Sequence, residues 1–465
     1  MIGPLARNSI SLLIALFFVL STRADAAPAL FPADGAANVC PDAPLEITFD
    51  SPPKLSHSGI IVVADGTSHA AVTTIDVGAG PATQPIGGVP NFKYLPVIVS
   101  GKSATIYPPN HALEYNTAYT VTVGARVFQG RDTPITWQFT TKSAPPAAGT
   151  TKLTVAADDS ADFCTVQGAV DFVPDGNTAP TTIFIRNGVY TGLVCVVNKN
   201  ALTFNGEDRK QAIIEYANNA RFNPASDQGV YHRGVFLARN CADLTLSNLT
   251  IRDTTPRGGS QAEAIILNGS PDAHAILTDV DLYSFQDTLQ INGQAYLRDC
   301  YIEGDVDFMW GTGPCFFENC HCHGTRSKGY YTQIRNTNAN HGYVYDHCTF
   351  DGPPGVTGMF LSRIDPSRFP YSEVVLIDCV LGKSVGPTGW LLNKSKEAPH
   401  IHFWEYNSHD ADGHPIDASR RLGVSRQLTL PEDAESVSHY RDPGWVLGGG
   451  WNPAPASAES PAGRE

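Results

Sequence analysis

Asp287 and Asp307 stand in an otherwise strand-like stretch, residues 284–311, which reads SFQDTLQINGQAYLRDCYIEGDVDFMWG. Asp287 follows Gln286, and Asp307 precedes Phe308. A carboxylate is costly to bury in an apolar strand unless something compensates for it. Two carboxyl groups held close together resist double ionisation, so one of them keeps a proton while the other is free to act as a base or nucleophile. The pair is therefore the first candidate for a catalytic site.

The elements that must position this pair carry an internal repeat. Each unit has an apolar residue, mostly Asn or Asp at its third position, and apolar residues at its fourth and sixth. The units are LSNLTI, LTDVDL, LRDCYI, FENCHC, YDHCTF and LIDCVL, starting at positions 246, 277, 297, 317, 345 and 376. Short strands at such a period, without a helical pattern between them, indicate a solenoid whose stacked coils bury a continuous core. We expect an all-β chain that contains a right-handed parallel β-helix.

Stacked coils would bring distant side chains together on one face. Asp287 and Asp307 are 20 residues apart, about one coil, and Gln261 precedes Gln286 by 25 residues. Arg363 follows Asp307 by about two coils. The spacing predicts that these five residues line one groove.

The repeat also explains most of the cysteines. One column of the repeat holds Leu249, Val280, Cys300, Cys320, Cys348 and Cys379. Column residues point inward and stack about 4.8 Å apart, so we interpret these thiols as small core side chains. Cys300 and Cys320 could also form a disulfide, because that spacing falls within the usual Cα range.

The sequence CHCH at 320–323 is similar to a metal-binding cluster. Alternation along a strand sends Cys320 and Cys322 to one side and His321 and His323 to the other. Ligands of a tetrahedral site must converge on one point, so no metal site is predicted here.

The rest of the chain divides into further segments. Residues 1–26 are expected to be a signal peptide, with Arg7, an apolar run at 10–20 and the cleavage motif ADA at 24–26. No later apolar run approaches a membrane span. We therefore predict a secreted protein, extracellular or periplasmic, without membrane association. The net charge of -14 argues against nucleic acid as a partner.

An antiparallel β-sandwich is predicted over residues 28–142, because LEITF, AYTVTV and ITWQF each alternate apolar and polar residues. It resembles bacterial Ig-like domains, and a spacer or stabilising role is favoured over ligand binding. Residues 143–150 form a Pro/Ala linker, residues 151–452 the β-helix, and residues 453–465 a tail that we expect to be disordered.

Four motifs in the β-helix resemble those of the pectin methylesterase (pectinesterase) family. They are QAEAI at 261–265, QDTL at 286–289, GDVDFMWG at 304–311 and LSRID at 361–365, and the resemblance extends over about residues 152–451. The family fold is the parallel β-helix. The resemblance implies a carboxylic ester hydrolase that removes methyl esters from pectin (homogalacturonan) and releases methanol. We expect a monomer that needs no metal or other cofactor.

The resemblance also implies a role for each polar residue. Asp307 would be the nucleophile that forms an acyl-enzyme, and Asp287 the general acid and then the general base. Arg363 would hold Asp307 ionised and oriented. Gln261 and Gln286 would donate amide hydrogen bonds to the oxyanion.

Some positions depart from the family pattern. Asp365 stands where the family usually has a Trp platform for a sugar ring, and Gln290 where it often has Tyr. Trp310 and Phe308 are the aromatic residues left to contact substrate, and we expect Asp365 to contact it as well. Asp305 replaces the usual Thr, and strand alternation would place it on the same side as Asp307, where its charge would raise the pKa of a neighbouring carboxyl.

Three alternatives stay open at this point. The chain could act on another acylated glycan, or it could be a polysaccharide-binding β-helix without activity. A calcium-dependent lyase or a glycosidase on the same fold is the third, with Asp287, Asp305 and Asp307 as the carboxylate cluster. The two Gln residues have no evident role in that cluster.

Overall fold

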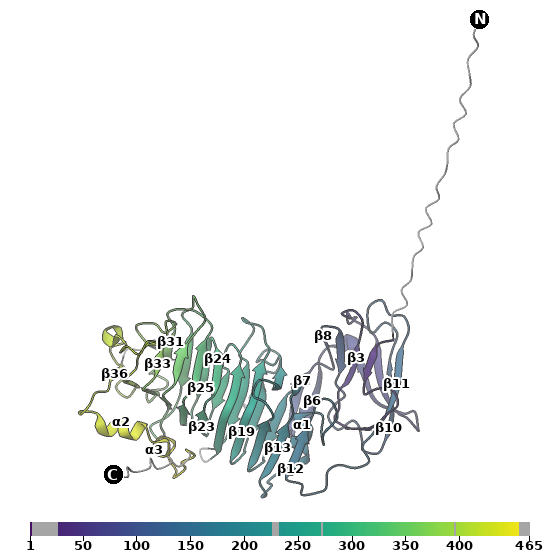
Figure 1. Ribbon diagram of the computed structural model, residues 1–465, viewed down its shortest axis with the longest axis horizontal. Helices are drawn as coiled ribbons and strands as arrows, with labels where there is room; N and C mark the ends of the chain where they lie inside the picture. The colour runs from purple at the N-terminus through teal and green to yellow at the C-terminus, as the bar shows by residue number, and fades with distance from the viewer. Residues whose placement is uncertain (2–26, 226–231, 271–272, 395–396, 455–465) are drawn as a thin grey trace.

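The structure is a computed structural model that describes residues 1, 27–225, 232–270, 273–394 and 397–454. An antiparallel β-sandwich precedes a parallel β-helix, and the two lie side by side along the long axis of the molecule (Figure 1). The expected signal peptide and nearly all of the expected tail lie outside the described residues. Within the described residues, no helix has the length and apolar character needed to cross a membrane.

The N-terminal sandwich contains the three strands read from the sequence. One sheet has the order β1 (Ala29–Phe31), β3 (Leu45–Thr48), β9 (Ser103–Ile106) and β8 (Val97–Ser100). The other has the order β2 (Ala36–Val39), β11 (Ile135–Thr141), β10 (Ala118–Val123), β4 (Ile60–Asp65) and β5 (Ala71–Asp76). Along β11 every second residue is buried, which is the pattern of a strand with one face on a core.

Two parallel sheets build the β-helix. The shorter one consists of β15 (Val194–Val197), β18 (Gly234–Arg239), β20 (Glu263–Asn268), β22 (Leu289–Ile291), β25 (Val306–Gly311), β28 (Tyr330–Ile334), β31 (Phe360–Ile364) and β34 (Trp390–Leu392). The longer one wraps the rest of each coil, with strands β12 (Lys152–Val155), β13 (Thr181–Ile185), β14 (Gly188–Thr191), β16 (Leu202–Gly206), β17 (Ala212–Tyr216), β19 (Leu244–Asp253), β21 (His274–Tyr283), β23 (Gln294–Arg298), β24 (Tyr301–Gly304), β26 (Cys315–Glu318), β27 (His321–Gly324), β29 (Tyr343–Asp346), β30 (Thr349–Asp351), β32 (Glu373–Ile377), β33 (Val380–Leu381), β35 (His402–Tyr406) and β36 (Arg426–Gln427). The expected parallel β-helix is confirmed.

The six repeat units lie in register on consecutive coils. Leu246 pairs with Leu277, and the column continues through Leu297, Phe317, Tyr345 and Leu376. The third residue of each unit has left-handed backbone, with φ between 50° and 55°, at Asn248, Asp279, Asp299, Asn319, His347 and Asp378. Asn and Asp tolerate this conformation better than most residues, so they mark the corner at which each coil turns.

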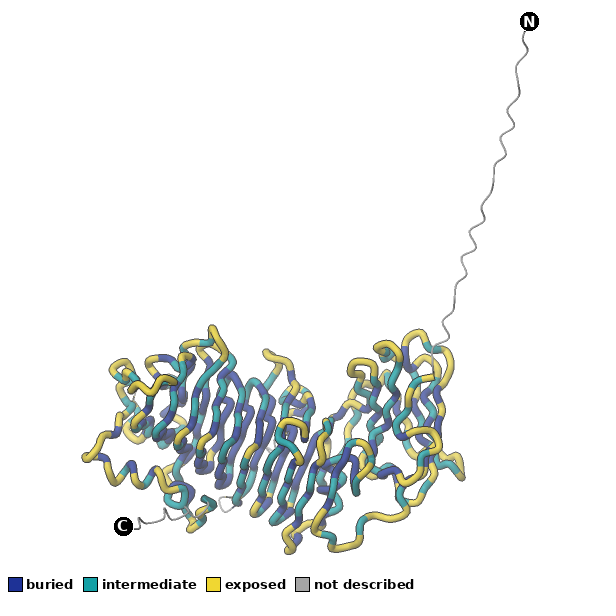
Figure 2. The backbone as a smooth tube through the Cα atoms, viewed as in Figure 1, coloured by how far each residue is buried: buried dark blue, intermediate teal, exposed yellow. Residues whose placement is uncertain are grey.

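The core of the β-helix is the inside of the coils, which Figure 2 shows as a continuous buried band. The column cysteines Cys300, Cys320, Cys348 and Cys379 are buried in it, and all ten cysteines are free thiols. Cys322 is buried too, whereas His321 and His323 face outward and both hydrogen-bond to Asp351. The alternation expected for the CHCH segment is therefore correct.

Other elements cover the first coil of the β-helix and the outer face of its later coils. The short helix α1 (Val166–Phe172) packs on the first coil, together with a hairpin of β6 (Ala82–Ile86) and β7 (Val89–Tyr94) that reaches over from the sandwich. Helices α2 (Ala434–Tyr440) and α3 (Pro443–Leu447) cover the outer face of later coils (Figure 1). Apolar side chains of the first coil and on the outer face of the later coils are thus shielded from water.

Candidate active site

The catalytic candidates gather on the outer face of the shorter sheet. Asp287 precedes β22, Asp307 lies on the neighbouring strand β25, and Arg363 lies on β31, two strands further along the sheet. The sequence-based prediction that successive coils bring these residues together is supported by this arrangement. Both carboxylates are nearly buried, with 9% exposure for Asp287 and 6% for Asp307.

The backbone at both aspartates is left-handed, with φ of 68° at Asp287 and 48° at Asp307. The pairing of β25 with β28 also shifts register between Val306 and Met309. Such conformations cost energy and concentrate at functional sites. They turn each carboxylate away from the simple alternation of a strand.

Two glycines make room for this geometry in the GDVDFMWG segment. A side chain at Gly304 would clash with Phe308, whose Cβ lies 2.2 Å from the position a Cβ would take. At Gly311 a Cβ would lie 1.8 Å from the carbonyl oxygen of Ile291 on the preceding coil. The glycines therefore allow the close approach that sets the Asp307 backbone.

Asp307 is held by a guanidinium and an amide. Arg363 donates from Nε to Oδ1 at 2.8 Å and from Nη2 to Oδ2, while Gln333 Nε2 donates to Oδ2 at 2.9 Å. Arg335 donates from Nε to Gln333 Oε1 at 2.9 Å and so orients that amide. Burial raises the pKa of Asp307, and Arg363 opposes the rise through its hydrogen bond and charge. A forked pair of this kind fixes the carboxylate and favours its ionised form.

Asp287 has a different environment. Arg233 Nη2 lies 3.2 Å from Asp287 Oδ2, but the same guanidinium is already bound to Glu263, with Nε at 2.9 and 2.8 Å from the two carboxylate oxygens. Glu263 is fully buried. Burial raises the pKa of Asp287 well above its ordinary value, the negative charges of Glu263 and Asp307 raise it further, and Arg233 opposes this rise. Of the two carboxyl groups, Asp287 thus has the environment that more strongly favours the protonated form.

The two glutamines lie on neighbouring coils beside the carboxylates. The backbone N–H of Ala262, next to Gln261, donates to the carbonyl of Gln286 at 3.1 Å. Gln286 in turn bridges to Val306, one residue before Asp307. Both side chains are partly exposed, and the Gln261 amide oxygen accepts a hydrogen bond from Ser260. An amide whose oxygen is engaged in this way presents its NH₂ group elsewhere.

The predicted aromatic contacts divide into two cases. Phe308 is fully buried and packs against Tyr331 in the core, with ring centroids 5.3 Å apart. The prediction that Phe308 contacts substrate is therefore wrong, because its ring lies in the core of the β-helix. Trp310 lies beside the site, and its ring is covered by the guanidinium of Arg335 at 4.5 Å and approached by that of Arg233 at 5.7 Å.

Asp365 has local partners. Its carboxylate accepts hydrogen bonds from Ser367 Oγ and from the backbone N–H of Ser367, and it pairs with Lys394 at 3.0 Å. These contacts hold the turn that follows β31. Its place as a substrate contact stays a prediction.

The expected effect of Asp305 is not found. This residue is 4% exposed and its carboxylate lies 3.8 Å from Arg257 Nε. Its charge does not contribute to the pKa shift of Asp307, on which Arg363 and Arg335 act. The alternation argument failed because it assumed a regular strand through Asp307.

Four residues of this site escaped the sequence analysis: Arg233, Glu263, Gln333 and Arg335. Glu263 had a signal, since it is a charge between apolar residues in QAEAI. Gln333 lies on β28, Arg335 just after it and Arg233 just before β18. All three are outside the motifs, and only the stacking of the coils brings them to the site.

Comparison with known proteins identifies the family. Residues 152–437 match the pectinesterase family, and residues 22–141 match the bacterial Ig-like domain. The chain belongs to the pectinesterase family. Pectinesterase 31 of Arabidopsis thaliana is 31% identical over 308 residues, which is 64% of this chain and 94% of that protein. Pectinesterase 1 of Olea europaea is 29% identical over 74% of this chain and 91% of that protein.

Solved structures agree on the fold of the pectinesterase domain. Pectin methylesterase from carrot superposes with a TM-score of 0.56 at 22% identity, covering 66% of this chain and 95% of that chain. PemA from Erwinia chrysanthemi, also a pectin methylesterase, gives a TM-score of 0.54 at 23% identity, covering 66% and 99%.

Proposed function

We propose that this pectinesterase is exported and hydrolyses methyl esters of pectin, with Asp307 as nucleophile and Asp287 as general acid and base. The observation that carries the assignment is the contrast between the two carboxylates. Arg363 donates hydrogen bonds to both carboxylate oxygens of Asp307 and favours its ionised form. Asp287 is buried near the negative charge of Glu263, which favours its protonated form. One nucleophile and one proton donor are the groups that ester cleavage requires.

In the first half of the reaction, Asp307 attacks the carbonyl carbon of a galacturonate methyl ester. The oxyanion that forms is stabilised by the amide groups of Gln261 and Gln286. As the tetrahedral intermediate collapses, Asp287 gives its proton to the methoxy oxygen and methanol leaves. The product is an acyl-enzyme, an anhydride between Asp307 and the galacturonate carboxyl group.

In the second half, Asp287 is ionised and accepts a proton from a water molecule. The hydroxide attacks the galacturonate carbonyl carbon of the anhydride, and Asp307 leaves as a carboxylate. Asp287 is again protonated, and the pectin unit has become a free galacturonate. The charge of Arg363 stabilises Asp307 both as nucleophile and as leaving group.

The substrate assignment rests on family membership and on the site. One similar solved structure is a pectin methylesterase in complex with a hexasaccharide, with a TM-score of 0.53 at 24% identity. Trp310 lies beside the site, under the guanidinium groups of Arg335 and Arg233, and we propose that the protein acts as a monomer. Apart from pectin, another methyl-esterified glycan is the second candidate, since Asp365 places a carboxylate where the family has an aromatic platform.

Methanol release tests the proposal. The purified protein is incubated with highly methylated pectin, with and without EDTA, and methanol, unsaturated chain ends and shorter oligomers are measured. We expect methanol without chain cleavage, at a rate that EDTA does not change, because the steps use only carboxylates and amides. Loss of activity in EDTA that calcium restores, together with unsaturated ends, would instead identify a lyase. Binding of pectin without any product would identify a binding protein.

A further inference from the structure

A pair of buried cysteines lies at the boundary between the sandwich and the β-helix. Cys40 follows β2, and Cys164 lies just before α1. Their exposures are 0% and 2%. The two sulfur atoms and a carboxylate oxygen of Asp42 all lie within 4.8 Å of one another. Although Cys164 belongs to the β-helix domain, its side chain packs in the apolar core of the sandwich.

The surrounding contacts hold the two cysteine segments against each other. Asp159 Oδ1 accepts from the backbone N–H of Cys40 at 2.7 Å and from the thiol of Cys164 at 3.4 Å. In the reverse direction, Asp42 accepts from the backbone N–H groups of Cys164 and Thr165 at 3.1 and 2.8 Å. The residues on either side of each cysteine are thus bonded across the boundary. Such reciprocal contacts fix the approach of the two sulfur atoms.

The stacked thiols of the β-helix core have partners within their own domain. Cys300, Cys320, Cys348 and Cys379 each point Sγ at two backbone carbonyls, one of their own corner and one of the preceding coil, at 3.4 or 3.5 Å. Cys40 Sγ likewise donates to two backbone carbonyls, those of Ala161 and Asp162 at 3.5 and 3.4 Å, but both belong to the segment that carries Cys164. The side chains of Cys40 and Cys164 thus come from different domains, and their sulfur atoms lie within 4.8 Å of each other.

We propose that Cys40 and Cys164 form a disulfide in the exported protein, which ties the Ig-like domain to the first coil of the β-helix. The proposal goes beyond the esterase function, because neither residue is near the candidate active site in the sequence or on its sheet. Disulfides form and persist in the compartments that exported proteins enter. The bond would close a loop that contains nearly the whole Ig-like domain, and long loops give the largest constraint on the unfolded chain.

The oxidant is another disulfide, either of a protein or of a small thiol compound, in a thiol–disulfide exchange. The thiolate of Cys40 attacks one sulfur of that disulfide, and the first thiolate leaves. The thiolate of Cys164 then attacks Sγ of Cys40 in the mixed disulfide, and the second thiolate leaves. The two protons lost by the cysteines pass to the released thiolates, so the chain is oxidised and the oxidant is reduced to two thiols. Because Cys40 is buried, the exchange takes place before the domains have docked.

A metal ion is the competing occupant of this cluster. Zinc needs four converging ligands, and both thiols would have to lose their protons. Here the Lys142 ammonium lies 2.9 Å from Cys40 Sγ, which places a positive charge where the cation would bind. The Asp42 carboxylate is occupied by the two backbone N–H groups and by the Thr165 hydroxyl. The cluster therefore favours a covalent bond over a cation.

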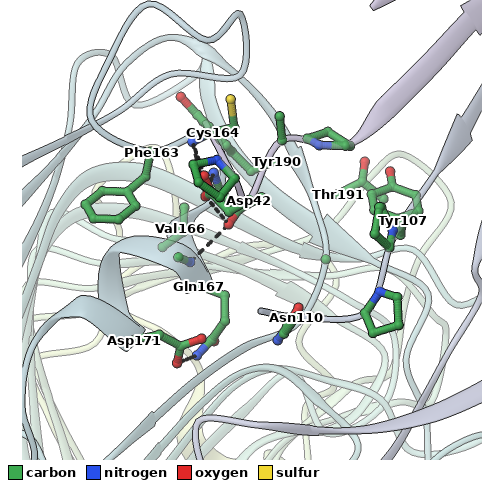
Figure 3. A pocket seen from close by; sticks show the side chains of 18 of the residues that line it. Asp42, Tyr107, Asn110, Phe163, Cys164, Val166, Gln167, Asp171, Tyr190 and Thr191 are labelled. Carbon is green, nitrogen blue, oxygen red and sulfur yellow. Dashed lines mark hydrogen bonds between the residues drawn. The ribbon is translucent and has the colours of Figure 1, made fainter. Parts of the chain in front are cut away.

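The bond would also hold the walls of an interdomain cavity together. The cavity has a volume of about 710 Å³, with Asp42, Tyr107 and Asn110 from the sandwich and Cys164 and Gln167 from the β-helix on its walls (Figure 3). Separation of the domains would move these walls apart. Reduction of the disulfide should therefore weaken the docked state.

Peptide mapping tests the proposal directly. Protein expressed with its signal peptide is purified from the exported fraction, unfolded with N-ethylmaleimide present, and digested with trypsin without reductant. Cys40 and Cys164 fall on different tryptic peptides, ending at Lys54 and spanning 153–186, and each peptide has a single cysteine. We expect one linked species that lacks two hydrogen atoms and that reductant separates. Recovery of both peptides with their own maleimide group would overturn the proposal.

Variants and reductant complete the test. Cys164→Ser should remove the linked species and expose Cys40 to maleimide, whereas Cys379→Ser, a core thiol of the column, should leave the link intact. Dithiothreitol should lower the Tm of the wild-type protein by at least about 3 °C and leave that of Cys164→Ser unchanged. Stoichiometric zinc in the native protein, absent from Cys164→Ser, would contradict the disulfide. The mapping of the wild-type protein decides the question even if a variant does not fold.

Discussion

Substitution of Glu263 by Gln would remove a buried negative charge that faces Asp287 across Arg233. Arg233 Nη2 lies 2.6 Å from Glu263 Oε1 and 3.2 Å from Asp287 Oδ2, so these two oxygens can be no more than 5.8 Å apart. At an effective dielectric constant of about 20, two unit charges at that separation repel each other by about 3 kcal/mol. Gln keeps the size of the side chain and removes this repulsion. The charge of Arg233 would then act mainly on Asp287 and favour its ionised form.

The expected result is a change in the pH profile. Asp287 must be protonated to release methanol, so activity falls as the pH rises through its pKa. Because Glu263→Gln lowers that pKa, the alkaline limb of kcat should move to lower pH. At neutral pH the loss of kcat should reach up to about a hundredfold, the equivalent of about 3 kcal/mol, and it should shrink as the pH is lowered. Methanol release from pectin, measured over a pH series, gives the profile.

A matched variant separates this effect from the loss of a buried ion pair. Glu405 is equally buried and binds Arg421 through both oxygens, at 2.8 and 3.0 Å, on a strand of the other sheet. Glu405→Gln should lower stability without moving the alkaline limb. An unchanged limb in folded Glu263→Gln would refute the account of Asp287. The same would be true if both variants moved it equally.

Three further predictions follow from single contacts. Arg363→Lys keeps the charge but loses the paired hydrogen bonds to the two oxygens of Asp307, so kcat for methanol release should fall by about tenfold to a hundredfold. An unchanged kcat would remove Arg363 from the mechanism. Asp287 holds a proton in the folded protein at pH values where the unfolded chain releases it, so the free energy of unfolding falls as the pH rises from its ordinary pKa to the raised one. Asp287→Asn should abolish that dependence and lose activity. In denaturant titrations at neutral pH it should be more stable than the wild type by about 1 kcal/mol. Equal pH dependence of stability in both proteins would contradict the raised pKa. Asn319 has a φ of 52° at a coil corner, so Asn319→Ala should cost about 1–2 kcal/mol in thermal unfolding and Asn319→Gly less, and equal losses would contradict this reading of the corner.

The stacking of the coils could be predicted because each coil repeats the same pattern of apolar residues and a polar corner residue. An apolar column cannot shift without exposing itself, and a short polar residue is needed wherever the chain turns with positive φ. Leu246 to Leu376 therefore fall in register as the pattern indicated. The meeting of Asp287, Asp307 and Arg363 on one sheet follows from the same period.

The environment of the carboxylates could not be read in the same way. The charges that set the pKa of Asp287 come from Arg233 and Glu263 on other coils, and a single sequence gives no measure of which coils place side chains in contact. The left-handed backbone at Asp307 breaks the alternation on which the expectation for Asp305 relied. Irregular backbone of this kind is typical of active sites, so the sequence rules fail at the residues that matter most for catalysis.

The central claim is that Asp307 is the nucleophile, and methanol release by two neighbouring variants tests it most directly. Asp307→Asn and Asp305→Asn change equally buried carboxylates two residues apart on the same segment. Circular dichroism and Tm establish that both variants are folded before activity on highly methylated pectin is measured. The account predicts that Asp305→Asn stays within about threefold of the wild type while Asp307→Asn loses at least about a thousandfold in kcat. A folded Asp307→Asn variant that releases methanol at a near-normal rate would contradict it.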